Sequence, residues 1–494
     1  MQNQGQKPGG TPPDGGPGGA PGGQGSSNVS HSGTTELTSD ATLSDQSYSS
    51  TSSAENALLV SGATVTIFNP MITKTGDDNG DSSDFYGTNA AVFAYSNATL
   101  NITGGTITTN GSHANAVFAY DSGVINITDT EITTSSNNSG GVMVTGGGTL
   151  NATNLTVETS GNSSAPIRSD RGGGTLTVEG GSYTSNGIGS PAIYSTADIT
   201  VKNAKLTATT SEGVVIEGLN SVTLESTTVT DTNNTLNGNS ETYKNIFIYQ
   251  SMSGDAETGT GTFTAKNSTF ITNKGDHFFI TNTTAVINLS GNKFTNNDTA
   301  GAFLRTQSGK WGNSGSNGGN VTLNATSQEI IGDIVIDSIS SLNLNLTGSY
   351  YKGTIENSGT VKLTLDAKSI VVLTGDSYVT SLENATSNNS NIYASGYKLY
   401  VNGTEVSINQ GTAPESFLSG SAETITSEVQ DVSSNDTGPS VNIPVLVSCI
   451  VGGVLIIGVV VAIIIKKKHD HRPKTPEIIT SENGQNLGPT NSAQ

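Results

Sequence analysis

Apolar residues recur in triplets along the chain between Leu58 and Val229. Neighbouring members of a triplet mostly stand seven positions apart, and a new triplet begins after roughly 22 to 26 residues. Short runs rich in Thr, Val and Ile surround them without a helical period, which is typical of β-strands. The triplets are Leu58/Val65/Ile72, Phe93/Leu100/Ile107, Phe118/Ile125/Ile132, Met143/Leu150/Val157, Ile167/Leu176/Tyr183, Ile193/Ile199/Leu206 and Val215/Val222/Val229.

This periodicity predicts an all-β fold, a right-handed three-sided parallel β-helix in which each triplet lines the interior of one coil. About fourteen coils of ~25 residues fit into the repetitive part of the chain. The rhythm breaks at 73–90, 231–244 and 301–320, where we expect loops. The predicted divisions are a Gly/Pro-rich arm (1–33), a cap (34–56), the β-helix (57–408), a Ser/Thr-rich stalk (409–440), a transmembrane helix (441–465) and a basic tail (466–494).

One segment near the C-terminus predicts a membrane anchor. Ile443–Ile465 carries no charge and is long enough to cross a bilayer as a helix, with a buried core helix as the alternative. Lys466, Lys467 and Lys468 follow at once and predict a cytoplasmic C-terminus, with the β-helix outside the plasma membrane. Small residues four apart in the span allow a homo-oligomer. The N-terminus lacks a signal-peptide pattern, so either the true start is missing or misassigned, which we favour, or export uses another route.

Composition narrows the classes of partner. The formal net charge is −20, which argues against nucleic acid because phosphate binding needs clustered Lys and Arg. Hydrophobic residues make up 32% of the chain, few for a compact globule of this length but enough for a solenoid. The single cysteine, Cys449, falls within the predicted span, so the predicted ectodomain has no disulfide.

Aromatic residues recur in the first strand of two coils. Alternate residues of a strand face opposite ways, so in 91–95 and 116–120 two arrangements are open. Phe93, Tyr95, Phe118 and Tyr120 point inward as a stacked core, which we favour, or they stand outside as a ladder. An outside ladder makes Tyr95 and Tyr120 candidate stacking residues for carbohydrate.

Two charged segments are candidate binding sites. Arg168, Asp170 and Arg171 occupy a lengthened turn, where two arginines form either a clamp for an acidic sugar or an Arg–Asp pair that holds the turn. The loop carrying Asp77, Asn79, Asp81 and Asp84 opens like a calcium loop but lacks the glycine and the distal glutamate of that motif. A solvated acidic loop is the alternative, and calcium is the one cofactor candidate.

The sequence shows no recognisable arrangement of catalytic residues. Hydrolases and lyases need acidic residues that converge on one face, whereas the acidic residues of this chain are spread over many predicted coils. The histidines show no metal-ligand spacing, and no Ser-His-Asp or Cys-His set can be read from the sequence. We therefore expect no catalytic residues and lean against an enzyme.

The coils resemble the pectate-lyase-like parallel β-helix surface proteins and adhesins. The matching stretches begin at Phe85 (FYGTNAAV), Ala116 (AVFAY) and Ile167 (IRSDRGGG). Phe270–Asn273 and Phe294–Asn297 also fit the Phe-x-x-Asn element of polymorphic membrane proteins, without its companion Gly-Gly-Ala-Ile. The resemblance implies display or adhesion, with extracellular glycans or a host surface as partners. A polysaccharide lyase or hydrolase on the same scaffold, or a passive coat, are the alternatives.

Overall fold

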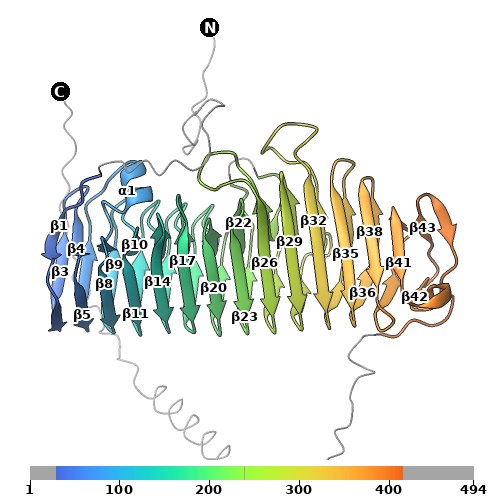
Figure 1. Ribbon diagram of the computed structural model, residues 1–494, viewed down its shortest axis with the longest axis horizontal. Helices are drawn as coiled ribbons and strands as arrows, with labels where there is room; N and C mark the ends of the chain where they lie inside the picture. The colour runs from blue at the N-terminus through green and yellow to red at the C-terminus, as the bar shows by residue number, and fades with distance from the viewer. Residues whose placement is uncertain (1–28, 238–239, 416–494) are drawn as a thin grey trace, which may run out of the picture. The chain divides into compact units, whose positions relative to one another are not determined.

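The structure is a computed structural model that describes residues 29–237 and 240–415. All described residues belong to one compact unit, and residues 423–494 lie outside the described part of the chain. In this unit, three long sheets run along a solenoid, and the coils from β1 to β30 each contribute one strand to each of these sheets (Figure 1). The prediction of a three-sided parallel β-helix is therefore confirmed.

Sheet A has 13 parallel strands and sheet B has 14. Sheet A consists of β1 (Gly33–Leu37), β4 (Asn56–Ser61), β7 (Val92–Tyr95), β10 (Val117–Tyr120), β13 (Val142–Thr145), β16 (Ile167–Ser169), β19 (Ile193–Ser195), β22 (Val214–Glu217), β25 (Lys244–Tyr249), β28 (Asp276–Thr281), β31 (Leu304–Thr306), β34 (Ile334–Ile336) and β37 (Ile355–Asn357). Sheet B consists of β2 (Ala41–Ser44), β5 (Thr64–Phe68), β8 (Thr99–Thr103), β11 (Val124–Thr128), β14 (Gly148–Thr153), β17 (Gly174–Glu179), β20 (Asp198–Lys202), β23 (Ser221–Glu225), β26 (Thr260–Lys266), β29 (Thr283–Ser290), β32 (Gly319–Thr326), β35 (Ser341–Thr347), β38 (Thr360–Leu365) and β41 (Ser381–Asn384).

Sheet C has ten strands, and two smaller sheets complete the solenoid. Sheet C consists of β3 (Ser47–Ser50), β6 (Met71–Lys74), β9 (Thr106–Thr109), β12 (Glu131–Thr134), β15 (Thr156–Thr159), β18 (Ser182–Ser185), β21 (Lys205–Ala208), β24 (Thr228–Asp231), β27 (Thr269–Thr272) and β30 (Lys293–Asn296). The smaller sheets consist of β33 (Glu329–Ile331), β36 (Tyr350–Gly353), β39 (Ile370–Leu373) and β42 (Ile392–Tyr393), and of β40 (Ser377–Val379), β43 (Leu399–Val401) and β44 (Thr404–Val406). A short 3-10 helix spans Ser387–Asn389.

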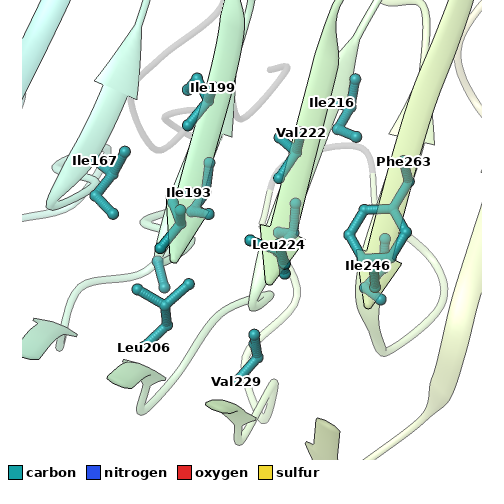
Figure 2. Packing of buried hydrophobic residues seen from close by; sticks show 14 of the residues in the cluster. Ile167, Ile193, Ile199, Leu206, Ile216, Val222, Leu224, Val229, Ile246 and Phe263 are labelled. Atoms are coloured by element: carbon teal, nitrogen blue, oxygen red, sulfur yellow. The ribbon is translucent and has the colours of Figure 1, made fainter. Parts of the chain in front are cut away.

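The interior is built from apolar residues stacked in register. Leu100, Ile125 and Leu150 pair with one another in sheet B and are fully buried, as the triplets predict. Figure 2 shows buried side chains from the three sheets, among them Ile193, Ile199 and Leu206, gathered in the interior. Burying such aliphatic side chains stabilises the fold by ~1.5–3 kcal/mol each, so the regular spacing of small apolar groups is enough to form a core.

The prediction that the first member of every triplet faces the interior is wrong for Phe93, Phe118 and Met143, which lie on the outer face of sheet A. In β7 and β10, Val92, Ala94, Val117 and Ala119 belong to the interior core, whereas the phenylalanine rings lie in a separate cluster outside it. The favoured prediction of an inward aromatic stack is therefore wrong. Loops cover these outer side chains, so both faces of the strand are apolar and the alternation that would identify the inner face is lost.

The coils are interrupted where the sequence rhythm breaks. A segment between β6 and β7 carries α1 (Asp81–Tyr86), and a second segment lies between β24 and β25. Two more loops, 250–259 and 307–318, connect sheet A to sheet B. Residues of the predicted cap form the first coil, with β1, β2 and β3 paired to β4, β5 and β6. At the other end, β43 and β44 form the antiparallel pair that ends the described fold.

Among the described residues, no helix is long and apolar enough to cross a membrane. The predicted transmembrane helix 441–465, the basic tail and most of the stalk lie outside the described residues, as does most of the N-terminal arm.

Candidate functional site

The outer face of sheet A differs from the outer faces of sheets B and C. Outward positions of sheets B and C are mostly Thr, Asn and Ser, whereas one outward column of sheet A carries aromatic, aliphatic and charged side chains. Strand register aligns this outer column as Leu59, Phe93, Phe118, Met143, Arg168, Tyr194, Val215, Phe247, Phe279 and Arg305. The chain therefore concentrates its chemically distinctive side chains on one face.

Long loops approach this face from both ends of its strands. The segment 75–91 and the described residues 240–243 lead into sheet A, and the loops 250–259 and 307–318 leave it. The α1 segment is held by hydrogen bonds from the Thr145 hydroxyl to the Phe85 carbonyl (2.7 Å) and from the Asn56 amide to the Gly87 carbonyl (2.8 Å). Loops are where binding residues concentrate when a rigid scaffold positions them, so we take this face as the candidate site.

Phe93, Tyr95, Phe118 and Tyr120 form the aromatic platform at the start of this face. Phe93 and Phe118 are fully buried, and Tyr95 and Tyr120 are half-buried beside them. The His31 ring stacks on Phe93, with centroids 4.6 Å apart and planes 16° apart, and lies 4.8 Å from Tyr95. Tyr95 and Tyr120 thus stand on the outer face, but the chain's own histidine covers part of the platform.

The predicted clamp residues form a buried ion pair. Arg168 Nη2 lies 3.0 Å from Asp170 Oδ2, and Arg168 Nη1 donates to the Ser163 carbonyl at 3.1 Å. Arg171 turns elsewhere: its Nε donates to Asp255 at 2.7 Å, and its guanidinium stacks 3.8 Å from the Phe85 ring centre. This geometry favours the alternative in which Arg168 and Asp170 hold the turn, while Arg171 fastens two loops.

The hydrogen bonds continue from Asp255 across the neighbouring coils. Ser253 donates to Asp255 Oδ2 at 2.8 Å, Ser251 donates to Glu217, and the hydroxyl oxygens of Ser251 and Ser253 lie 2.7 Å apart. The Tyr194 hydroxyl donates to Glu217 Oε2 at 2.7 Å. The carboxyl groups of Asp170, Glu217 and Asp255 thus converge on one face, although their residues lie far apart in the sequence. We call the five residues Asp170, Glu217, Asp255, Arg168 and Arg171 the charged network.

Electrostatics single out one member of the charged network. Burial raises the pKa of Asp170 to about 7, and the nearby Asp255 acts in the same direction, while Arg168 opposes the rise. A carboxyl group with such a pKa can hold or release a proton near neutral pH, which is what general acid–base chemistry requires. Both its oxygens already have partners, because the backbone N–H of Arg171 donates to Oδ1 at 3.0 Å.

A pocket of ≈ 300 Å³ opens further along the same face. Its lining includes Tyr243, Asp276, Arg305 and Gln307. Arg305 Nε donates to Asp276 Oδ2 at 2.7 Å, and Asp276 Oδ1 also accepts from the Ala302 backbone N–H at 2.7 Å. Asp276 is buried and Arg305 is about a quarter exposed (24% of its side chain), so the carboxylate fixes the guanidinium at the pocket wall.

The predicted calcium residues point to different partners. Asp77 accepts a hydrogen bond from the Ser112 backbone (2.8 Å), Asp84 pairs with His113 (2.9 Å), and Asp81 is exposed 4.0 Å from Arg171. Asn79 is exposed in the same segment. In the part of the chain that the structure describes, no group of three or more His, Cys, Asp or Glu side chains could hold a metal ion. Calcium stays a prediction without support from this geometry.

Several residues of the face were missed from the sequence. Tyr194 and Arg305 belong to the outer column, and Glu217 ends β22 beside it. The interval between successive members of this column varies after Arg168, so counting a fixed repeat from β10 does not find them. Asp255 lies in a loop whose sequence carries no comparable signal. Our expectation that the acidic residues are scattered did not anticipate the charged network, because loops bring Asp255 to it.

Comparison with known proteins supports the fold class. Residues 140–321 match a family model described as the right handed beta helix region. Comparison with curated proteins and with solved structures gave no significant match. The sheets and this match together define a right-handed parallel β-helix protein. The pectate-lyase-like and adhesin features of the resemblance go beyond what these comparisons show.

Proposed function

We propose that this chain is a single-pass cell-surface protein whose β-helix binds glycans of its surroundings or of a host surface. The proposal combines the apolar segment Ile443–Ile465 and its following lysines, read from the sequence, with the outer face of sheet A. Glycan sites commonly pair flat aromatic rings with planar polar side chains that bond sugar hydroxyls. That combination occurs on this face.

The observation that carries the proposal is the pocket beside Arg305. Asp276 engages Arg305 through Nε, and Nη1 of Arg305 has no hydrogen-bond partner among the described residues. The Tyr243 ring stands at the wall with Lys274 Nζ 3.8 Å from its centre, and Gln307 adds an amide. The volume of ≈ 300 Å³ accommodates one sugar residue. We assign to Arg305 the role of bonding ligand oxygens.

Glycan-array binding of the whole ectodomain tests this proposal. Arg305→Ala should lower the affinity for any glycan bound by the wild type by about tenfold or more, because a charge-assisted hydrogen bond contributes roughly 1.5–3 kcal/mol. Lys266→Ala is the matched control, since Lys266 lies exposed on the outer face of sheet B. Absence of glycan binding by the wild type, or equal binding by Arg305→Ala, would refute the assignment.

The charged network favours a second candidate, a polysaccharide lyase or hydrolase. Its support is the pKa of Asp170 near neutrality beside two further carboxyl groups. Release of reducing ends or unsaturated uronides from polysaccharides by the wild type, with loss in Asp170→Asn, would establish this function. Glycan binding without product release would leave the adhesive function, and neither activity would indicate a passive coat.

Exposure on the cell surface has a separate test. Protease treatment of intact cells should release β-helix fragments, while an epitope tag fused to the C-terminal tail should stay protected from the protease. Replacing the segment Ile443–Ile465 with a polar linker should move the protein into the soluble fraction. Retention of that variant in the membrane would argue against this segment as the anchor.

A further inference from the structure

The aromatic platform is already occupied by a ring of the same chain. The His31 ring lies face to face with Phe93 and within 4.8 and 5.9 Å of the Tyr95 and Tyr120 ring centres. Its position is therefore that of a flat ligand held against three aromatic rings. Aromatic faces accept other flat, partly apolar rings by the same contacts, including the C–H face of a pyranose.

The two segments that cover the platform are attached very differently. The α1 segment is fixed by Thr145 and Asn56, as described above, and by the pair between Asp84 and His113 (2.9 Å). Gly87, which follows α1, lies so close to the Phe93 and Phe118 rings that an added Cβ would stand 2.5 to 2.9 Å from them. This segment is thus a fixed wall of the platform.

His31 has a weaker attachment. Among the described residues, the one hydrogen bond of its side chain joins Nε2 to the Tyr86 carbonyl at 2.8 Å. Its backbone precedes the first strand, β1, so no sheet ladder holds it in place. Removing this single side chain would uncover one face of Phe93 and open space beside the Tyr95 and Tyr120 rings without removing any contact that fixes the wall.

We propose that the aromatic platform is a second glycan-stacking site and that His31 competes with the sugar ring for it. This inference rests on the proposed function, because it takes pyranose rings as the ligand class. The half-buried tyrosines supply phenol groups at the rim for sugar hydroxyls, and the Phe93 ring supplies the stacking surface. The apparent affinity of such a site is lowered by the fraction of molecules in which the internal ring occupies it.

The test measures binding of soluble β-1,4-linked hexamers of glucose and of N-acetylglucosamine by calorimetry. His31→Ala should bind one of these hexamers about tenfold more tightly than the wild type, because it removes one stacked ring and one hydrogen bond from the competitor. His31→Phe keeps a ring in place and should stay close to the wild type. Tyr95→Ala in the His31→Ala background should remove the gain, and unchanged melting temperatures would show that each variant is folded.

Several outcomes would overturn the inference. These are equal binding by the wild type and His31→Ala, no binding by either, and His31→Phe binding as tightly as His31→Ala. The proposed function fails separately. If Arg305→Ala weakens glycan binding while His31→Ala changes nothing, the proposal for the pocket is supported and the proposal for the platform is refuted. If His31→Ala binds more tightly while Arg305→Ala binds like the wild type, the platform is supported and the role of Arg305 is refuted.

Discussion

Replacing the buried Asp231 should stabilise the β-helix and flatten its pH dependence. Asp231 ends β24 and is fully buried, with Oδ2 accepting from the Asn233 backbone N–H at 3.3 Å. Oδ1 has no hydrogen-bond partner among the described residues. Burial raises the pKa of Asp231 to about 8, the hydrogen bond from the Asn233 backbone opposes the rise, and the nearby Glu212 adds to it.

The sign of the pH effect follows from the direction of this pKa. Because the folded state binds the proton more tightly than the unfolded chain, its relative stability is greatest below about pH 4. Stability then falls as the pH rises through about 8. A rise from 3.8 to about 8 corresponds to ~6 kcal/mol above pH 8, of which ~4 kcal/mol is already lost at pH 7. Asp231→Asn keeps the shape of the side chain and removes its titration.

Urea unfolding followed by circular dichroism at pH 5, 7 and 9 measures this effect. We expect Asp231→Asn to exceed the wild type by a few kcal/mol at pH 9 and by less at pH 5. Asp121→Asn is the control, because Asp121 is exposed in a turn. Parallel pH profiles of Asp231→Asn and the wild type, or a variant less stable at pH 9, would refute the reasoning.

Three further predictions concern the interior and the α1 segment. Ile125→Ala should cost ~2–5 kcal/mol in urea unfolding because it empties a fully buried position, whereas Asn126→Ala on the outer face of the same strand should cost about 1 kcal/mol. Tyr183→Phe should raise stability by about 1–2 kcal/mol in the same assay, since the buried Tyr183 hydroxyl has no partner among the described residues. The hydrogen bond that His113 donates to the Asp84 carboxylate raises the pKa of His113 above 6.5, so the pair stabilises the fold at low pH and is lost as the pH rises through that pKa. An NMR titration should show a lower His113 pKa in Asp84→Asn, and an unchanged pKa would contradict the pairing.

The sequence predicts the interior of sheets B and C well. The interior columns that contain Leu100 and Ile107 can be predicted from the sequence spacing alone. Their neighbours along each strand are polar and point outward, so buried apolar and exposed polar residues alternate regularly. Sheet A is harder to read. Its outward residues are covered by loops, so Val92 and Phe93 are equally buried and hydropathy cannot separate the two faces.

The candidate site shows the same limit. Arg168, Asp170 and Arg171 were identified because the spacing of the repeat lengthens around them. Their partners could not be predicted, since Arg171 meets Asp255 across 84 residues of chain and both bond through loops. His31 precedes the first coil, outside any repeat, and its stacking on Phe93 depends on the path of a segment without regular structure.

The constant interval between hydrogen-bonded neighbours has a consequence for how such a gene can change. Asn126 donates to Asn101 and Asn151 donates to Asn126, each across 25 residues. Unequal crossing-over between equivalent codons of adjacent repeats would therefore delete or insert one complete turn and leave the remaining ladders aligned. The length of the protein can vary by whole turns during evolution, whereas a frame-preserving insertion of a few residues inside a strand would shift the pairing downstream within that turn.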